Sequence, residues 1–258
     1  MSKIIKKAVY FTALGVVGLA GLFVVWNLFF PPLAKYKTQN LKMTSFMEYR
    51  QAQWKAEGKK KSITQLWVPL SQVSSYLVNA VIISEDDKFW EHKGFDWQAI
   101  REAMRRNFRS KHLIFGGSTI DQQLVKNMFL NPSRNIFRKA REAILTWRLE
   151  RVLTKKRILE LYLNVVEWGD GIFGAEAASA YYFQTRASTL TPDEAARLAA
   201  MLPQPRRYNP LKVRSSTYLE ERSREIMAIM EKRGLLKLEE QEPMTPPVKD
   251  PEIIKERP

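Results

Sequence analysis

The chain has 258 residues, of which 45% are hydrophobic, and it carries a formal net charge of +15. That length leaves room for one domain plus extra segments, and the hydrophobic fraction is enough to build a core. The absence of cysteine excludes disulfides and thiol chemistry and removes the usual zinc-finger ligands. His92 and His112 are the only histidines, and no His-Glu-x-x-His motif is present, which excludes that class of zinc site.

The N-terminal part of the chain predicts a membrane anchor. Residues 8–34 contain no charged residue, and this run of 27 residues exceeds the ~20 that a helix needs to span a bilayer. It is also longer than the core of a signal peptide, about 7–15 residues, which favours anchoring over removal. Lys3, Lys6 and Lys7 precede it, so the positive-inside rule places residues 1–7 in the cytoplasm and the rest of the chain outside.

The remainder of the chain divides into three parts by composition. Residues 35–63, which include the run Lys59 to Lys61, predict a basic linker. Residues 64–236 carry the patterned apolar positions of a folded domain. Residues 237–258 are rich in Glu, Lys and Pro, and they predict a disordered tail.

Within the folded domain, start and stop signals predict a mostly helical structure. Strand signals are thin, and Gln65 to Val68 is one short candidate. Helices are predicted at these places: Asp96 to about Phe108; Ile136 to about Leu163 with a break near Thr154; from Thr191-Pro192-Asp193-Glu194 onward; and from Ser215 or Ser216 to Gly234.

A dense acidic block follows the apolar run Val78 to Ile83, with four carboxylates and a histidine before Asp96. Charge of that density beside a buried segment is costly unless it is tightly paired or takes part in chemistry. A carboxylate at the rim of an apolar element has its pKa raised by desolvation, which suits a general base, and Glu85 is the candidate. The alternative is a solvated acidic loop with Asp96 as an ordinary helix N-cap.

Residues 116–127, Gly-Gly-Ser-Thr-Ile-Asp-Gln-Gln-Leu-Val-Lys-Asn, predict a helix start that favours an anion. The two glycines permit close backbone approach, and Ser118 with Asp121 fits a capping box. Gln122 and Lys126 are four residues apart and are therefore expected to share one helical face. The amides and dipole of the helix start indicate a site for a phosphate-bearing substrate, although the P-loop spacing is absent.

Three further clusters follow along the chain. In Arg134 to Glu142, Arg138 and Glu142 lie at i, i+4, and one interpretation is an ordinary surface pair that contributes about 0.3–0.5 kcal/mol. Lys155 to Asn164 has the periodicity of a half-buried helix, and Leu198 to Pro210 ends a helix in a proline-rich turn. Any one of these blocks could occur by chance.

Taken in order and at these spacings, the five blocks resemble the peptidoglycan glycosyltransferases, glycosyltransferase family 51. The resemblance covers roughly residues 65–215. It rests on these matches: Glu-Asp-x-x-Phe-x-x-His-x-Gly-x-Asp (85–96), Gly-Gly-Ser-Thr-Ile-x-Gln-Gln (116–123), Arg-Lys-x-x-Glu (138–142), Lys-x-x-Ile-Leu-Glu-x-Tyr-Leu-Asn (155–164) and Tyr-Asn-Pro (208–210). Asp121 lies where the family usually has threonine, which the capping-box interpretation treats as a conservative change at a helix start.

The resemblance implies a mainly α, lysozyme-like glycosyltransferase domain with a small membrane-facing lobe, preceded by one transmembrane helix. The implied reaction transfers the growing lipid-linked glycan chain to the 4-hydroxyl of lipid II, with inversion and release of undecaprenyl pyrophosphate. The implied roles are Glu85 as the base, Glu142 as an assisting catalytic group, and Ser118, Gln123, Lys126, Arg134 and Arg138 as substrate-binding residues. No essential cofactor and no metal ligand is expected, and a divalent cation at the pyrophosphate stays open.

Residues 104–115 interleave basic and apolar side chains, which predicts contact with an anionic membrane surface. The competing explanations are nucleic-acid binding and an ordinary basic helix and loop. The anchor argues against nucleic acid, because an outward-facing domain meets anionic lipid first. We therefore expect the bacterial inner (cytoplasmic) membrane, with a periplasmic catalytic domain and other cell-wall synthesis proteins as candidate partners.

The sequence also limits the expected activity. No serine has a lysine three residues later, so the Ser-x-x-Lys nucleophile of the penicillin-binding transpeptidases is missing and cross-linking activity is not expected. Two other classes stay open, a lytic peptidoglycan glycosidase and a non-catalytic membrane-anchored cell-wall scaffold. The glycosidase would need no pyrophosphate clamp at Lys126 and Arg134, and intact Glu85 and Glu142 argue against the scaffold.

Overall fold

The computed structural model describes residues 3–110, 116–133 and 135–236 of the chain. Helices make up 66% of the structure, so the expected mainly α fold is confirmed. The α-helices are α1 (Lys3–Phe29), α2 (Ser45–Ala56), α3 (Ser75–Glu85), α4 (Trp97–Ser110), α5 (Ile120–Phe129), α6 (Ile136–Val152), α7 (Lys155–Val165), α8 (Ala175–Phe183), α9 (Pro192–Met201) and α10 (Thr217–Lys232). The predicted tail, residues 237–258, and residue Arg134 lie outside the described residues.

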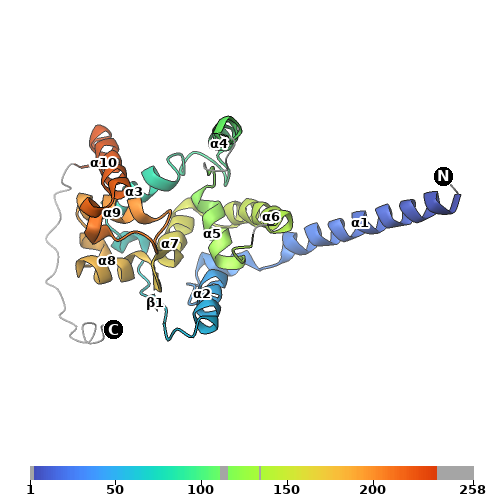
Figure 1. Ribbon diagram of the computed structural model, residues 1–258, viewed down its shortest axis with the longest axis horizontal. Coiled ribbons are helices and arrows are strands. Elements are labelled where there is room, and N and C mark those ends of the chain that lie inside the picture. The colour runs from blue at the N-terminus through green and yellow to red at the C-terminus, as the bar shows by residue number, and fades with distance from the viewer. Residues whose placement is uncertain (1–2, 111–115, 134, 237–258) are drawn as a thin grey trace.

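Helix α1 projects away from the rest of the molecule, and the other helices gather at its C-terminal end (Figure 1). Among the described residues it is the one helix long and apolar enough to cross a membrane, in agreement with the predicted anchor. It ends at Phe29 because Pro31 and Pro32 cannot continue a helix. Arg148 of α6 binds the C-terminal end of α1. Its guanidinium donates to the carbonyl oxygens of Asn27, Phe29 and Pro31 at 2.8, 3.2 and 3.0 Å.

The segment predicted as a basic linker, residues 35–63, is built into the fold. It contains α2, which Thr44 caps and which buries Met47 and Trp54. Arg50 on the same helix pairs with the buried carboxylate of Glu167 at 2.6 Å. The linker was predicted from the lysines of this segment. The structure depends instead on its apolar residues at helical spacing, because the burial of each apolar side chain removes hydrocarbon from water.

Three short strands, β1 (Thr64–Gln65), β2 (Glu167–Gly169) and β3 (Ile172–Phe173), form a small sheet in the order β1-β3-β2. Strand β1 runs parallel to β3, and β2 runs antiparallel to it. The turn between β2 and β3 needs Gly171, because its φ is +92° and a Cβ there would lie 2.9 Å from the Ser62 carbonyl oxygen. The predicted strand at 65–68 overlaps β1 only at its first residue.

The predicted start of α4 at Asp96 and the predicted break near Thr154 are confirmed. Asp96 accepts hydrogen bonds from the backbone amides of Gln98 and Ala99 at 2.9 and 2.8 Å, and so begins α4. Thr154 separates α6 from α7 as the N-cap of the latter. Capping signals are local, so they hold wherever the tertiary structure leaves the backbone free to follow them.

Helices α9 and α5 lie at the centres of two packed groups. Helix α9 packs against α3 and α10, and its face of small residues (Ala195, Ala196, Ala199 and Ala200, all fully buried) allows close approach. Helix α5 packs against α2, α6 and α7. The acidic block and the Gly-Gly-Ser-Thr block therefore meet between these groups, where α3 ends and α5 begins.

Candidate active site

Glu85 is the last residue of α3, and Gln123 on α5 binds it directly. The Gln123 Nε2 amide donates to Oε2 of Glu85 at 2.8 Å, and the Tyr162 hydroxyl donates to Oε1 of Gln123 at 3.0 Å. Tyr162 is fully buried, so it fixes the amide with its NH2 group toward the carboxylate. Two of the predicted site residues, Glu85 and Gln123, are therefore in contact.

The environment of Glu85 raises the pKa of its carboxyl group above the usual value. Burial is the largest cause, and the neighbouring charge of Asp86 acts in the same direction. The bond from Gln123 and the positive charges of Arg222 and Lys126 oppose the rise. A carboxyl group with a raised pKa is a stronger base once ionised, which is the property a general base at neutral pH needs.

The start of α5 is capped by Thr119 and not by the predicted Ser118. The Thr119 hydroxyl accepts from the Gln122 amide at 3.3 Å, and the Gln122 side chain accepts from the Thr119 amide at 3.1 Å, which completes a capping box. The prediction paired Ser118 with Asp121, which have the same three-residue spacing. Each of them lies one position before its counterpart in the observed pair, Thr119 and Gln122. Ser118 itself lies exposed directly before the cap, where its hydroxyl is accessible to a ligand.

The two glycines before the cap differ in their surroundings. A Cβ on Gly117 would lie 3.0 Å from Cα of Ile100, so this residue lets the backbone approach α4 closely. Gly116 has nothing within 4 Å of such a Cβ. The expectation of close backbone approach therefore holds for one of the two positions.

Lys126 lies on the exposed side of α5 and faces several charged groups. The Lys126 side chain has accessible surface, but the surrounding protein still removes part of the water around its ammonium group, and this desolvation is the largest cause that lowers its pKa. The charges of Arg138 and Lys139 lower the pKa further. The carboxylates of Glu142 and Glu85 favour its charged form. Gln122 lies four residues earlier on the same helix, but its side chain accepts from the Thr119 amide in the capping box and is buried.

Glu142 is 3% exposed, which contradicts the interpretation of Arg138 and Glu142 as an ordinary surface pair. Its two oxygens bind different cations: Arg138 Nη1 lies 2.6 Å from Oε2, and Lys139 contacts Oε1. A buried carboxylate that binds two cations positions them firmly, since each is held by a charge-assisted hydrogen bond. Three cations, Lys126, Arg138 and Lys139, therefore cluster around one buried acid.

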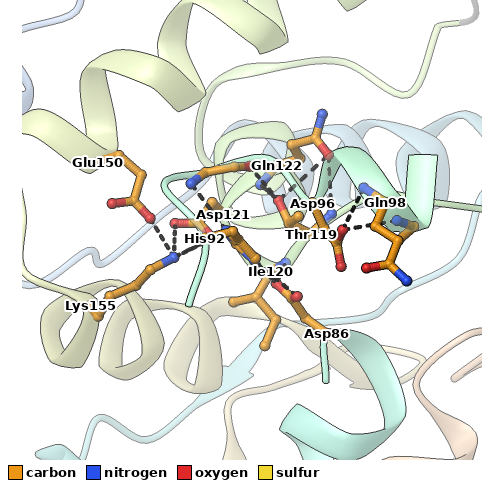
Figure 2. Close-up of polar contacts among 12 residues, drawn as sticks. Asp86, His92, Asp96, Gln98, Thr119, Ile120, Asp121, Gln122, Glu150 and Lys155 are labelled. Carbon is orange, nitrogen blue, oxygen red and sulfur yellow. Dashed lines mark hydrogen bonds and ion pairs between the residues drawn. The ribbon is translucent and has the colours of Figure 1, made fainter. Parts of the chain in front are cut away.

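The sequence did not predict a buried cluster at the start of α5, which is formed by Asp86, His92, Asp121, Glu150 and Lys155 (Figure 2). Asp86 accepts from the Ile120 amide at 2.9 Å and from His92 Nε2 at 3.0 Å, and Asp121 pairs with Lys155 at 3.2 Å. Ligand atoms of Asp86, His92 and Asp121 lie within 4.8 Å of one another, which is a spacing that a metal could use. The Lys155 ammonium lies 3.2 Å from Asp121 and also contacts Glu150.

Comparison with known proteins agrees with this picture. A sequence model of the transglycosylase family matches residues 52–231. A biosynthetic peptidoglycan transglycosylase of Aromatoleum aromaticum is 50% identical over 191 residues, which cover 74% of this chain and 83% of that protein. Proteins of the same name from Dechloromonas aromatica and Neisseria gonorrhoeae are 47% and 45% identical, covering 74% and 73% of this chain and 84% and 81% of their own.

The fold, the paired acid and amide, and these similarities define a glycosyltransferase with a lysozyme-like helical domain. The chain belongs to the transglycosylase family, because the family match covers more than half of its length. The family match begins inside α2, so part of the segment expected to be a linker falls within the matched region.

Proposed function

We propose that this protein polymerises the glycan strands of peptidoglycan from lipid II. The observation that carries the proposal is the arrangement along α5. Lys126 of this helix interacts electrostatically with two acids: Glu85, whose pKa is raised, and the buried Glu142, which binds Arg138 and Lys139. A base next to a site for a multiply charged anion is what the transfer of a pyrophosphate-linked sugar requires.

In the proposed reaction, Glu85 takes the proton from the 4-hydroxyl of lipid II. The hydroxyl oxygen forms a bond to C1 of the growing chain while the bond from C1 to the pyrophosphate oxygen breaks. The leaving undecaprenyl pyrophosphate carries away the electron pair of that bond, and attack from the opposite face inverts C1. Lys126 and Arg138 stabilise the developing negative charge.

The remaining predicted roles belong to the same proposal. Glu142 holds Arg138 and Lys139 in place near Lys126, which is the assisting role expected for it. Gln123 orients Glu85, and Ser118 offers an exposed hydroxyl to the substrate at the helix start. The expected role of Arg134 rests on the sequence alone. A divalent cation at the pyrophosphate is compatible with the proposal but no step depends on it.

The exposed side chains of α4 support contact with an anionic membrane surface. Trp97, Met104 and Phe108 are 66%, 67% and 87% exposed and are spaced to lie on one face of the helix. Arg105 and Arg109 are exposed on the same helix, so apolar and cationic groups reach the solvent together. Soluble monomers seldom expose large apolar groups in a cluster without an interaction to cover them.

We also propose a location that follows from α1 and its flanking lysines. The short N-terminus lies in the cytoplasm, α1 crosses the bacterial inner membrane, and the catalytic domain lies in the periplasm. The protein acts on lipid II and the lipid-linked strand there, without transpeptidase activity or nucleic-acid binding. Other cell-wall synthesis proteins are its further proposed partners.

The experiment that tests the proposal uses the purified full-length chain and two substrates. Labelled lipid II should give polymer that muramidase digests, and isolated cell wall should release no soluble fragments. A protein that releases fragments but makes no polymer would be a lytic enzyme. A protein that does neither, while folded and bound to membranes, would be the scaffold.

A further inference from the structure

The C-terminal end of α1 packs against α6 through one face. Along the last two turns of α1, Asn27 is 1% exposed and Phe23 is half-buried, whereas the residues around them are exposed. These two positions are four residues apart, so they lie on the same side of the helix. The ring centre of Phe23 lies 6.4 Å from that of Phe137 on α6. The anchor therefore meets the domain in one defined orientation.

Arg148 supplies the polar part of this contact. The last carbonyl groups of a helix have no partner within the helix, and the helix dipole makes them favourable sites for a cation. Arg148 is half-buried and donates to three carbonyl oxygens at the end of α1, those of Asn27, Phe29 and Pro31. A planar guanidinium with five N–H donors holds several acceptors in a fixed geometry. Arg148 therefore fixes both the distance and the rotation of α1 relative to α6.

A second arginine holds the chain directly after the anchor. Arg157 on α7 donates to the carbonyl oxygens of Tyr36 and Gln39 at 2.9 and 2.8 Å. Leu33 and Tyr36 in the same stretch are buried. The chain that leaves the anchor is therefore fixed on α6 and α7, so a movement of α1 is passed on to these helices.

The contact sets the height of α6 relative to the membrane-spanning helix. Phe23 lies six residues before the end of α1 at Phe29, which corresponds to about 9 Å along the helix. Its partner Phe137 and the neighbouring Ile136 are 71% and 77% exposed, and they form the start of α6. The start of α6 therefore lies beside the apolar part of the anchor, and Arg138 follows it directly.

This height matches the place of the charged group in a lipid-linked substrate. The tail of such a substrate lies in the hydrocarbon of the bilayer, and its pyrophosphate is excluded from the hydrocarbon and stays at the interface. The buried Glu142 holds Arg138 and Lys139 just after the apolar start of α6. These cations can meet the pyrophosphate only if α6 keeps its height.

We propose that Arg148 is a positioning residue: it locks the end of α1 onto α6 and so holds the cations of α6 at the depth of the substrate's pyrophosphate. This inference rests on the proposed function, because the pyrophosphate belongs to the substrate of that function. Arg148 acts through the backbone of the anchor. Its loss should therefore weaken the binding of a substrate that is held in a bilayer and leave the chemical step intact.

The first test compares full-length wild type with Arg148→Met in liposomes. Methionine keeps an unbranched side chain that packs well but cannot donate to the carbonyl groups. The KM for lipid II in the bilayer should rise about fivefold or more, with kcat within about twofold of wild type. With a short-chain, water-soluble lipid II analogue in detergent, the two KM values should agree within about twofold, because no bilayer fixes the depth of that substrate.

Two further variants make the comparison specific. Arg151→Met is the matched control, because Arg151 is exposed on the same helix and lies 3.8 Å from the centre of the Trp147 ring. It should match wild type with both substrates. Phe137→Ala removes the ring contact with α1 and keeps Arg148, and it should raise the KM in the bilayer in the same direction. The test therefore does not depend on the folding of a single variant.

A second readout does not use the activity. Because the chain has no cysteine, Ile136→Cys can carry a single fluorescent label, whose depth is measured with lipids that carry a nitroxide at known positions. The label should be quenched most by a nitroxide high on the acyl chain, and addition of Arg148→Met should abolish this preference for one depth. A label at Tyr181→Cys, an exposed position on α8 at the side of the domain away from α1 (Figure 1), should stay unquenched.

The outcomes separate this inference from the proposed function. Equal depth profiles and equal KM values for wild type, Arg148→Met and Phe137→Ala would overturn the inference. A changed depth with an unchanged KM would overturn the positioning role. If wild type made no polymer while Arg148→Met still lost the fixed depth, the proposed function would be removed and only the junction between α1 and α6 would remain.

Discussion

Gln123 donates its side-chain amide to Glu85 at 2.8 Å, and this bond joins the start of helix α5 to the end of helix α3. The amide is held in turn by the hydroxyl of the buried Tyr162 at 3.0 Å. Because a hydrogen bond to the ionised carboxylate favours that form, Gln123 limits how far burial raises the pKa of Glu85. One side chain therefore both orients the proposed base and adjusts its strength.

Replacement of Gln123 should change the pH profile of the enzyme. Gln123→Leu removes the bond that favours ionised Glu85, so the pKa of Glu85 rises and the acid limb of kcat/KM moves to higher pH. We expect the rate at pH 6.5 to fall by about tenfold, with a partial recovery at pH 8.5. Tyr162→Phe leaves the amide but frees its orientation, and it should shift the same limb by less. An unchanged acid limb in Gln123→Leu would contradict this role.

The raised pKa of Glu85 also predicts that the proposed base destabilises the fold. The folded state holds a proton that the unfolded state, with its ordinary value of 4.5, has already lost, so stability falls as the pH rises from there through the folded pKa. Glu85→Gln cannot lose a proton and avoids this fall. We expect its Tm to exceed that of wild type by about 2 °C or more at pH 8, with the difference disappearing near pH 4. If Glu85→Gln and wild type had the same Tm at pH 4 and at pH 8, burial would not disfavour the ionised form of Glu85.

Lys126 should be needed for polymerisation and not for cutting a finished strand. Lys126→Ala removes one of the cations expected to stabilise the leaving pyrophosphate, and such a loss lowers kcat by about 10²–10³-fold. The matched control is Lys156→Ala, which removes an exposed lysine from α7. Both variants are assayed for polymer from lipid II and for fragments from isolated cell wall. Polymer made equally well by Lys126→Ala and by the control would remove this residue from the site.

The contact between the anchor and the domain can be tested by cross-linking, because the chain has no cysteine. The ring centres of Phe23 on α1 and Phe137 on α6 lie 6.4 Å apart. A chain with Phe23→Cys and Phe137→Cys should cross-link within itself with a short bifunctional thiol reagent. Phe11→Cys with Phe137→Cys is the control and should not. Equal cross-linking of both pairs would show that α1 does not pack against α6 in the membrane-bound protein.

Local signals account for what the sequence predicted correctly. The N-caps Asp96, Thr154 and Thr191 and the uncharged N-terminal run depend on neighbours along the chain, so their patterns survive folding. The Glu85 block is informative for a related reason. A carboxylate that directly follows an apolar run is drawn to the rim of the core wherever that run is buried.

Long-range contacts account for what the sequence did not reveal. Met47 and Trp54 lie in a segment rich in lysine, and their burial depends on contacts with elements far along the chain, such as the bond from Trp54 to Asp170 at 3.2 Å. Asp121 resembles an ordinary first-turn acid until Lys155, 34 residues later, is brought against it. The sequence did contain one indication of this contact, because an acidic side chain such as Asp121 in a buried helical segment needs a partner.

The measurement that tests the central claim most directly is polymerisation of labelled lipid II by Glu85→Gln. The variant keeps the size of the side chain and its hydrogen bond to Gln123, but it cannot accept a proton. The matched control is Glu91→Gln, which neutralises an exposed acid in the same block. The account predicts that Glu85→Gln loses at least about 10²-fold in kcat while Glu91→Gln keeps near-normal turnover. Near-normal turnover in folded Glu85→Gln would show that this carboxylate is not the base.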